Sequence, residues 1–309
     1  MSERAVAGPQ AAGAGLAIPA DTVARLDAAG LDPAQVISLV AAALAEDLAG
    51  GADVTTAATV PPGRRGQAGL IARSAGTVAG LPVAALAFHL VPGGEHVTIA
   101  YQAADGDRLS PGQQVLTVAG PVRAILTAER TALNLLCHLS GVATLTRQFA
   151  DAVAGTQARI RDTRKTMPGL RALQKYAVRC GGGVNHRMSL SDAALVKDNH
   201  VAAAGSVGAA FAAVRREAPG LPVEVECDTL EQVAEALEAG ADLILLDNFA
   251  VPDMAAAVAL TAGRAKLEAS GRITIDSARA IAETGVDYLA VGALTHSAPV
   301  LDIGLDLLE

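Results

Sequence analysis

Basic residues gather in one short segment of the chain. Between Asp162 and His200, side chains that carry or can carry positive charge surround a run of three glycines; they include Arg164, Lys165, Lys175, Arg179, His186, Arg187 and Lys197. The chain has 4 lysines and 20 arginines, and three of the lysines lie in this segment. Arginine holds carboxylate or phosphate through paired hydrogen bonds, whereas lysine is a mobile point charge suited to phosphate or to proton transfer. The segment therefore predicts a pocket for a ligand with several negative charges.

Neighbouring residues and net charge weigh against the alternative, a solvated basic face, which is the commoner explanation of a charge run. Apolar residues precede the charges at Ile160 and at Leu195-Val196, as in buried strands that end in charge. The 309 residues have a formal net charge of −8, so we expect no general affinity for nucleic acid or for an anionic membrane. A small molecule is then the expected partner of the basic cluster.

Strands and helices alternate from residue 159 onward. The expected strands cover residues 159–162, 194–197, 223–226, 243–246, 265–268 and 288–291. Alternating strands and helices predict an α/β fold with a parallel sheet, and the short spacing favours an incomplete (β/α) barrel of about six parallel strands. The alternative is an open, doubly wound sheet.

Polar residues or glycines follow each expected strand, where a parallel barrel places its reacting groups. They are Arg164, Lys165, Lys197, Glu226, Asp247, Ser270, Gly271 and Gly292. The cations on the early strands suit anions, and the two later carboxylates suit a magnesium ion or sugar hydroxyls. The backbone N–H groups of the serine and glycines suit a phosphate. This order predicts a site for a ribose phosphate.

Two of these residues, and His186 in the basic segment, also have a purely structural interpretation. Glu226 is expected either in the site or in an ion pair with a neighbouring lysine, and Asp247 either in the site or as a helix cap. His186 is either a carboxylate ligand or a satisfied structural histidine. The sequence alone leaves these alternatives open.

The first half of the chain predicts a compact domain of helices and short strands. We expect an opening helix over 32–48, strands at 67–72, 77–79, 97–101 and 114–118, and a helix over 81–90. A long helix is expected over 124–153, with Gly141 as a weak point or a close-packing point. Asp228 and Glu231 predict a capping box for a helix over 230–237. Three cysteines without metal-ligand spacing favour a reduced, cytoplasmic compartment.

From about Val36 to Leu307 the sequence resembles the quinolinate phosphoribosyltransferase family. The resemblance rests on ordered motifs, which include Asp53-Val54-Thr55-Thr56, Glu129-Arg130, Asp162-Thr163-Arg164-Lys165-Thr166, Asn185-His186-Arg187, Lys197-Asp198-Asn199-His200, Val225-Glu226, Leu246-Asp247-Asn248, Glu268-Ala269-Ser270-Gly271 and Val291-Gly292-Ala293. It implies an enzyme that transfers a phosphoribosyl group from phosphoribosyl pyrophosphate to quinolinate with decarboxylation. The products are nicotinate mononucleotide, pyrophosphate and CO2, in NAD biosynthesis.

The resemblance also implies the domain organisation. A disordered tail is expected at 1–20, an N-terminal α/β sandwich domain at 21–128 with 297–309 packing back on it, and an incomplete α/β barrel as the catalytic domain at 129–296. The family forms homodimers with shared active sites, and whether dimers assemble further is left open.

Roles for individual residues follow from the matched motifs. Arg164, His186, Arg187 and Lys197 would hold the two quinolinate carboxylates, with Arg130 from the neighbouring subunit, while Lys165, Glu226, Asp247, Ser270, Gly271 and Gly292 would surround phosphoribosyl pyrophosphate. Magnesium (Mg²⁺) would be bound with the donor, ordered by Glu226 and Asp247 directly or through water. Lys165, Glu226 and Asp247 are the expected catalytic residues, with Lys165 as the first choice for protonating the decarboxylated ring.

Two departures and two rivals accompany this interpretation. Arg272 stands where many relatives have a second glycine, and residues 251–265 are a few residues short. One rival is a paralogue with the same fold that acts on another anionic substrate, such as the homologue associated with molybdenum transport or a non-decarboxylating nicotinate enzyme. The other is a non-catalytic sensor of a phosphate ligand.

Overall fold

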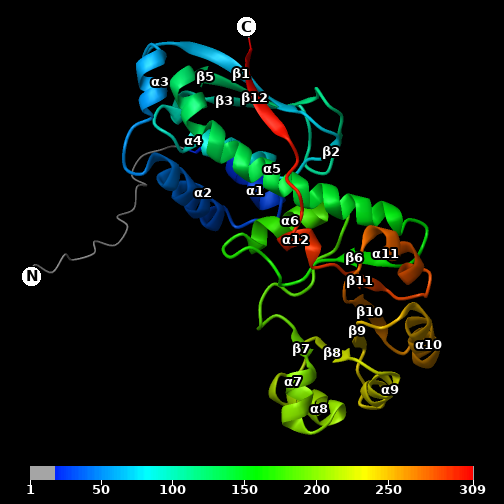
Figure 1. Ribbon diagram of the computed structural model, residues 1–309. Helices are drawn as coiled ribbons and strands as arrows, with labels where there is room; N and C mark the ends of the chain where they lie inside the picture. Colours follow the sequence, from blue (N-terminus) through cyan, green and yellow to red (C-terminus); the bar gives the residue numbers. More distant parts are fainter. Residues whose placement is uncertain (1–17, 309) are drawn as a thin grey trace, which may run out of the picture. The chain divides into compact units, whose positions relative to one another are not determined.

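The computed structural model describes residues 18–308, which form two units (Figure 1). The first unit contains residues 18–75, 80–137 and 301–308, and the second contains residues 76–79 and 138–300. The long helix α5 (Val122–Ala152) contains the point of division, and the predicted boundary after residue 128 also falls inside it. Of the predicted tail at 1–20, residues 1–17 lie outside the described part of the chain, and Ala20 begins helix α1 (Ala20–Ala28).

An antiparallel sheet of four strands is the framework of the first unit. Its order is β12-β1-β5-β3, with bounds Ile303–Leu308, Arg65–Ala72, Gln114–Pro121 and Thr98–Tyr101. Strand β12 pairs antiparallel with β1, so the end of the described chain completes this sheet. The remaining elements of this unit are α2 (Pro33–Leu48), α3 (Val54–Thr59), α4 (Leu81–His89), the 3-10 helix η1 (Gly94–His96) and β4 (Arg108–Leu109).

Helix α4 is the centre of the first core, because all its residues are buried and both α1 and α2 contact it. The prediction that the helix over 32–48 opens the fold was wrong, since α1 precedes it, and α3 was not predicted. Helix α1 buries only Thr22 and Leu26, and α3 has six residues, so neither has a long apolar stripe for the sequence to reveal.

Within residues 18–308, no single helix is long and apolar enough to cross a membrane. In this part of the chain, only α1 and α2 taken together have the length and apolar composition of a membrane span, and the two helices are bent by 113° relative to each other.

Six parallel strands form the sheet of the second unit (green through red in Figure 1). They are β6 (Arg159–Arg161), β7 (Ala194–Val196), β8 (Val223–Cys227), β9 (Leu243–Asp247), β10 (Lys266–Ser270) and β11 (Tyr288–Ala290). The helices are α6 (Arg171–Cys180), α7 (Asp198–Ala204), α8 (Val207–Glu217), α9 (Leu230–Glu238), α10 (Val251–Thr261), α11 (Ile275–Ala282) and α12 (Ala293–His296), and β2 (Gly76–Thr77) also belongs here.

The strand order of this sheet is β6-β11-β10-β9-β8-β7. From β7 to β11 each strand pairs with the next strand in sequence, and the last strand, β11, pairs with the first, β6, which is the cyclic order of a barrel. No ladder joins β6 to β7 in the described sheet, so the barrel is incomplete at that seam. The fold prediction is confirmed, and the doubly wound alternative, which requires the strand order to reverse at a switch point, is wrong.

Candidate active site

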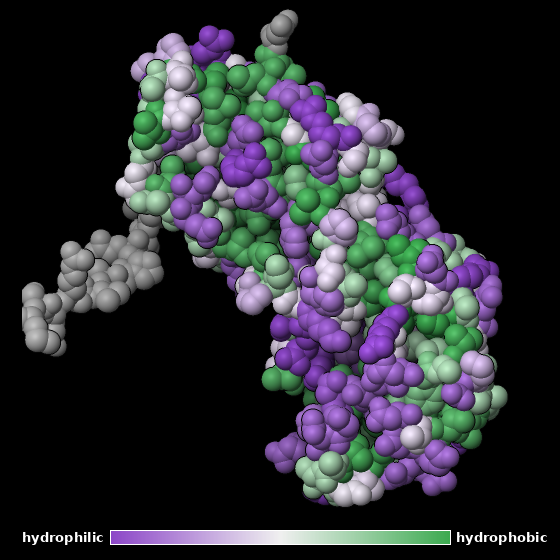
Figure 2. Space-filling model, viewed as in Figure 1, coloured by the Kyte–Doolittle hydropathy of each residue, from purple (hydrophilic) through white to green (hydrophobic). Residues whose placement is uncertain are grey.

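A cavity of about 460 Å³ lies at the carboxyl ends of the parallel strands. Its lining residues are Thr163, Arg164, Lys165, His186, Arg187, Leu195, Lys197, Glu226, Leu245, Asp247, Glu268, Ser270 and Ala290. Every strand of the sheet contributes to this lining, either directly or through the residues that follow it. In the view of Figure 2 the surface around β7 and β8 is largely hydrophilic.

Strand register brings the later lining residues together in two rows. Glu226 pairs with Leu245, which pairs in turn with Glu268. Asp247 pairs with Ser270, which pairs in turn with Ala290. Because side chains alternate between the two faces of a strand, each row points to one face. The residues of the two rows therefore reach the same cavity.

Two arginines provide the cationic wall. Neither Arg164 nor Arg187 forms an ion pair with a carboxylate within residues 18–308, and Arg164 Nε is buried without a hydrogen-bond partner there. Arg187 donates from Nη1 to the carbonyl oxygen of Ala193 at 2.7 Å. Burial, followed by the charge of Arg164, lowers the pKa of Arg187 from its ordinary value. Two neighbouring guanidinium groups in this state suit an anion that neutralises both.

Two lysines line the same cavity in different states. Lys197 Nζ lies 2.6 Å from Glu226 Oε2, so the expected ion pair of Glu226 with a lysine is present inside the predicted site. The side chain of Lys165 forms no hydrogen bond or ion pair in the described part of the chain, while its main chain is held by Thr163 and Thr295. Lys165 is therefore a free cation at the cavity wall.

Asp247 ends β9, and its carboxylate accepts a hydrogen bond from Asn248 Nδ2 at 2.6 Å. The alternative of a helix cap is wrong, because Ala250 is the N-cap of α10. Asn248 has a left-handed backbone (φ 55°), and a β-carbon on Gly271 would overlap its side chain. Glycine at 271 therefore lets the β10 loop pack on the residue that orients Asp247.

His186 has both ring nitrogens in hydrogen bonds within the protein. Nδ1 accepts from the backbone N–H of Arg187 at 2.7 Å, so Nε2 carries the hydrogen and donates to Glu224 Oε2 at 2.6 Å. Burial lowers the pKa of His186 to about 4, which keeps the ring neutral near pH 7. The ring is a fixed part of the cavity wall, with no nitrogen left for a ligand in this arrangement.

A buried cluster lies directly behind His186. Atoms of His186, Glu224 and Glu268 approach within 4.8 Å of one another, a spacing that suits a metal ion. A metal ligand needs a nitrogen lone pair, and here Nδ1 already accepts an N–H while Nε2 bears the hydrogen. Arg161 also donates to Glu268 at 2.5 Å. The donor set therefore does not fit a metal, whereas the cavity oxygens of Glu226 and Asp247 are of the kind that Mg²⁺ prefers.

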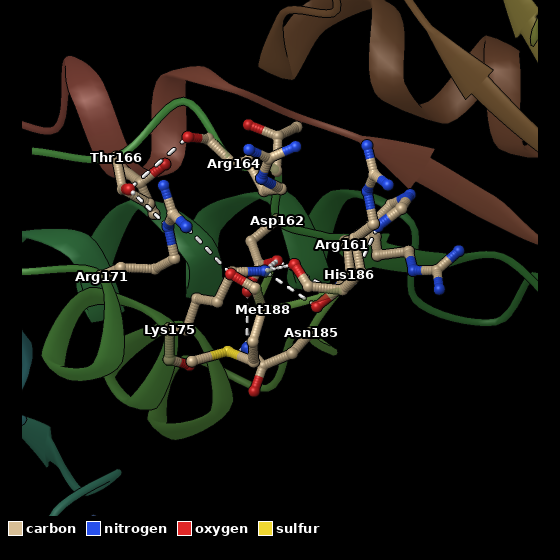
Figure 3. A network of polar contacts seen from close by, with 12 residues as sticks. Arg161, Asp162, Arg164, Thr166, Arg171, Lys175, Asn185, His186 and Met188 are labelled. Atoms are coloured by element: carbon tan, nitrogen blue, oxygen red, sulfur yellow. Dashed lines mark hydrogen bonds and ion pairs between the residues drawn. The ribbon is translucent and has the colours of Figure 1, made fainter. Parts of the chain in front are cut away.

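The composition of the basic segment predicted that its cations form one ligand-binding pocket. The structure shows that only some of them do. Lys175 is fully buried and its ammonium group is bonded to Asp162 (Figure 3), while Arg179 donates to Asn185. Neither residue lines the cavity. The glycine run packs on α5 instead, since a β-carbon on Gly181 would overlap the main chain of that helix.

Three predicted residues do not appear in the cavity lining. Gly271 and Gly292 lie beside it: Gly292 approaches Lys165, whose Cδ would be 3.1 Å from a β-carbon at that position. Arg130 is an exposed residue of α5 in the first unit. It forms no ion pair within residues 18–308.

The sequence reasoning missed the buried acidic residues Glu224 and Glu268 and their partner Arg161. A signal was present, because Glu224 lies two residues before Glu226, and Glu268 two residues before Ser270, on strands with apolar residues at the alternate positions. Period-two alternation directs both members of each pair to the same face. Charged residues inside apolar strands were therefore as informative as those at the strand ends.

The fold and the site together define a class: an α/β-barrel protein that binds a polyanionic small molecule at the carboxyl ends of its strands. The sequence model for the N-terminal domain of quinolinate phosphoribosyl transferase matches residues 53–140, and that for its C-terminal domain matches residues 142–306. The chain belongs to the quinolinate phosphoribosyltransferase family.

Individual relatives agree with this assignment. The chain is 56% identical over 268 residues to nicotinate-nucleotide pyrophosphorylase [carboxylating] of Mycobacterium leprae, covering 86% of this chain and 94% of the relative. The crystal structure of NadC from Streptococcus pyogenes superposes with a TM-score of 0.85 at 43% identity, covering 90% and 99% of the two chains. The nicotinate-nucleotide pyrophosphorylase from Francisella tularensis gives 0.85 at 38% identity, covering 89% and 96%.

Proposed function

We propose that the protein transfers the phosphoribosyl group of phosphoribosyl pyrophosphate to quinolinate with decarboxylation, forming nicotinate mononucleotide, pyrophosphate and CO2 for NAD biosynthesis. One observation carries the proposal: Arg164 and Arg187, which form no ion pair with a carboxylate within residues 18–308, share a single cavity with Glu226 and Asp247. Cations and carboxylates that line one cavity suit a dicarboxylate beside a ribose phosphate. The names of the relatives support the same reaction.

The cationic wall is the proposed quinolinate site. Arg164, Arg187 and Lys197 hold the two carboxylates, because guanidinium groups bind carboxylates through paired hydrogen bonds. His186 forms the neutral wall against the ring. Arg130 is proposed to enter from the second subunit of a homodimer, and the enzyme is proposed to act in the cytoplasm.

The other lining residues form the proposed site of phosphoribosyl pyrophosphate. It comprises Lys165, Glu226, Asp247, Ser270, Gly271 and Gly292, with the two acidic residues on the ribose side and the others on the phosphates. Glu226 and Asp247 would hold Mg²⁺ directly or through water, and the bound ion would stabilise the negative charge of the pyrophosphate.

In the proposed reaction the ring nitrogen of quinolinate attacks the anomeric carbon of the ribose. The bond from that carbon to the pyrophosphate oxygen breaks, and pyrophosphate leaves with the bonding electrons. The transition state resembles an oxocarbenium ion, whose positive charge the carboxylates of Glu226 and Asp247 offset. Holding both reactants in one cavity shifts the entropic cost of their encounter from the chemical step to the binding step.

Decarboxylation follows from the charge on the ring. Once the nitrogen is alkylated it is cationic. When the bond between the adjacent ring carbon and the carboxylate breaks, CO2 leaves and the bonding electron pair stays on the ring carbon, where the cationic nitrogen stabilises it. A proton must then reach that carbon. Lys165 is the proposed donor, because its side chain lines the cavity and its ammonium group has no hydrogen-bond or ion-pair partner among the described residues.

The test is an incubation of the purified protein with quinolinate, phosphoribosyl pyrophosphate and Mg²⁺, followed by chromatographic detection of nicotinate mononucleotide and of released CO2. We expect both products from quinolinate and none from nicotinate, which lacks the second carboxylate. Equal turnover of nicotinate would favour a non-decarboxylating enzyme. Binding of the donor without any product would favour a sensor, and either result would overturn the proposal.

A further inference from the structure

Lys175 is fully buried and has no role in the proposed reaction, yet it is at the centre of the network in Figure 3. Its ammonium group donates to Asp162 Oδ1 at 2.5 Å, to the carbonyl oxygen of His186 at 2.8 Å and to that of Arg187 at 3.0 Å. An ammonium group has three hydrogens to donate. All three are therefore used, and two of them hold the main chain of residues that line the cavity.

Asp162 holds the same segment from the other side. It is also fully buried, and besides Lys175 its carboxylate accepts from the backbone N–H of His186 at 2.8 Å and from Asn185 Nδ2 at 2.5 Å. Asn185 Nδ2 also donates to the carbonyl oxygen of Lys175 at 2.8 Å. The network thus joins the end of β6, helix α6 and residues 185–187.

Stability alone is a weak explanation for such a pair. Removing two charges from water is costly, and burial lowers the pKa of Lys175 as a result. Buried ion pairs are often replaceable by apolar residues without loss of stability. What an apolar pair cannot supply is the set of directed bonds to the peptide groups of His186 and Arg187. Those bonds determine where the Arg187 side chain begins.

We propose that Lys175 and Asp162 are positioning residues, which fix the main chain of residues 185–187 and thereby direct the Arg187 guanidinium into the anion site. The proposal rests on the proposed function, since it names the groups that hold the quinolinate half of that site. Neither residue lines the cavity, so both act through Arg187 and His186.

The test uses the double variant Asp162→Asn with Lys175→Met. This pair leaves no unpaired buried charge, keeps the volumes similar and removes the three ammonium bonds. Thermal unfolding and circular dichroism establish that the variant is folded. Initial rates then give the Michaelis constant for quinolinate and, separately, that for phosphoribosyl pyrophosphate, and calorimetry gives the affinity for quinolinate alone.

We expect the quinolinate constant to rise about tenfold or more, as the loss of one or two directed contacts implies, with the donor constant within about threefold of the wild type. A quinolinate constant within twofold of the wild type would overturn the proposal. An equal rise in both constants would also overturn it, because it would indicate general disruption of the site.

A milder variant keeps the test decisive if the double variant does not fold. Asn185→Ala leaves the Lys175–Asp162 pair intact and removes the side-chain bonds that tie residue 185 to it, so the same selective rise is expected at smaller size. As a control, Arg279→Met with Glu283→Leu removes an exposed ion pair of the same unit and should leave both constants unchanged. If the wild-type protein makes no product from quinolinate, the proposed function fails. If the wild type makes the product and the variants have wild-type Michaelis constants, the positioning role fails and the proposed function stands.

Discussion

Arg161, Glu268, Glu224 and His186 form a buried group with more carboxylates than cations. Arg161 neutralises Glu268 at 2.5 Å, and the neutral ring of His186 donates to Glu224. One oxygen of each carboxylate, Glu224 Oε1 and Glu268 Oε1, has no hydrogen-bond partner among the described residues. Burial raises the pKa of each glutamate to about 7, and for Glu268 the charge of Glu224 adds to the effect. The group therefore favours a retained proton near neutral pH.

This proton predicts a pH-dependent stability. The folded-state pKa of Glu268 lies above its ordinary value of 4.5, so between these values the folded protein holds a proton that the unfolded chain has released. The stabilisation is complete below about pH 4.5 and is lost as the pH rises through 7. His186 has the opposite effect, but only below its ordinary pKa of 6.5. From pH 6.5 to 8.5 we expect the free energy of unfolding to fall by about 1 kcal/mol.

Urea unfolding at several pH values from 6.5 to 8.5 measures the slope of the free energy of unfolding against pH. Glu268→Gln mimics the protonated side chain and should flatten it, whatever the change in absolute stability. Glu238→Gln, at an exposed position on α9, should leave the slope as in the wild type. An unchanged slope in Glu268→Gln would show that residue 268 does not retain the proton.

The residue types of the site could be predicted from the sequence, but their division into ligand-facing and internal groups could not. Arg187 and Lys175 are both cations in one segment, yet only Arg187 reaches the cavity. Lys175 lies inside α6 and faces Asp162, which is 13 residues away in the sequence. Which cation meets a protein carboxylate depends on tertiary packing, and a single sequence does not encode that pairing in local spacing.

Elements show the same division between local and tertiary information. The ends of the strands in the second unit were expected to within two residues, because apolar runs ending in charge are a local signal. The capping box expected from Asp228 and Glu231 was wrong: Thr229 is the N-cap of α9, and its side chain accepts from the backbone N–H of Gln232. Two adjacent residues that can both cap a helix differ only in backbone geometry, which spacing does not reveal.

Gly141 in α5 gives the element-scale prediction. A β-carbon at this position would overlap the carbonyl oxygen of Pro299, so the expected close-packing role is the correct one of the two alternatives. Gly141→Ala should improve helix propensity by up to about 1 kcal/mol. Overpacking costs about 1–3 kcal/mol, and we expect that cost to prevail, lowering the free energy of unfolding in urea titrations.

Gly208 in α8 provides the matched control. A β-carbon there would meet its nearest neighbour, Glu235 Oε1, at 3.5 Å, which is an ordinary contact. Gly208→Ala should therefore be neutral or stabilising by up to about 1 kcal/mol. A Gly141→Ala protein as stable as the Gly208→Ala protein would contradict the close-packing role.

At the scale of the whole molecule, most of the cyclic strand order was predictable, because from β8 to β11 each βα unit adds its strand next to the previous one. Residues 130 and 165 present a different problem. Arg130 is an exposed residue of α5 in the first unit, and Lys165 lines the cavity of the second. The homodimer proposed above assigns them to one active site made by two subunits, and this assignment can be tested without a structure of the dimer.

Arg130→Ala and Lys165→Ala homodimers should each be inactive. In a mixed dimer, one site receives both substitutions and the other receives neither, so mixing restores one intact site in two. If subunits exchange at random, half of the dimers are mixed and the activity should reach about a quarter of the wild-type value. The measurement is nicotinate mononucleotide formation after the two variants are dissociated and reassociated together.

A second mixture separates shared sites from nonspecific recovery. Lys165→Ala and Glu226→Gln affect residues that line the cavity of the same second unit, so each subunit of their mixed dimer carries one lesion in its own site. No activity should return in this mixture, because no site is intact. If activity returns when Lys165→Ala is mixed with Arg130→Ala but not with Glu226→Gln, Arg130 must act across the subunit boundary. If activity returns in neither mixture, Arg130 lies in its own subunit's site or outside the site altogether.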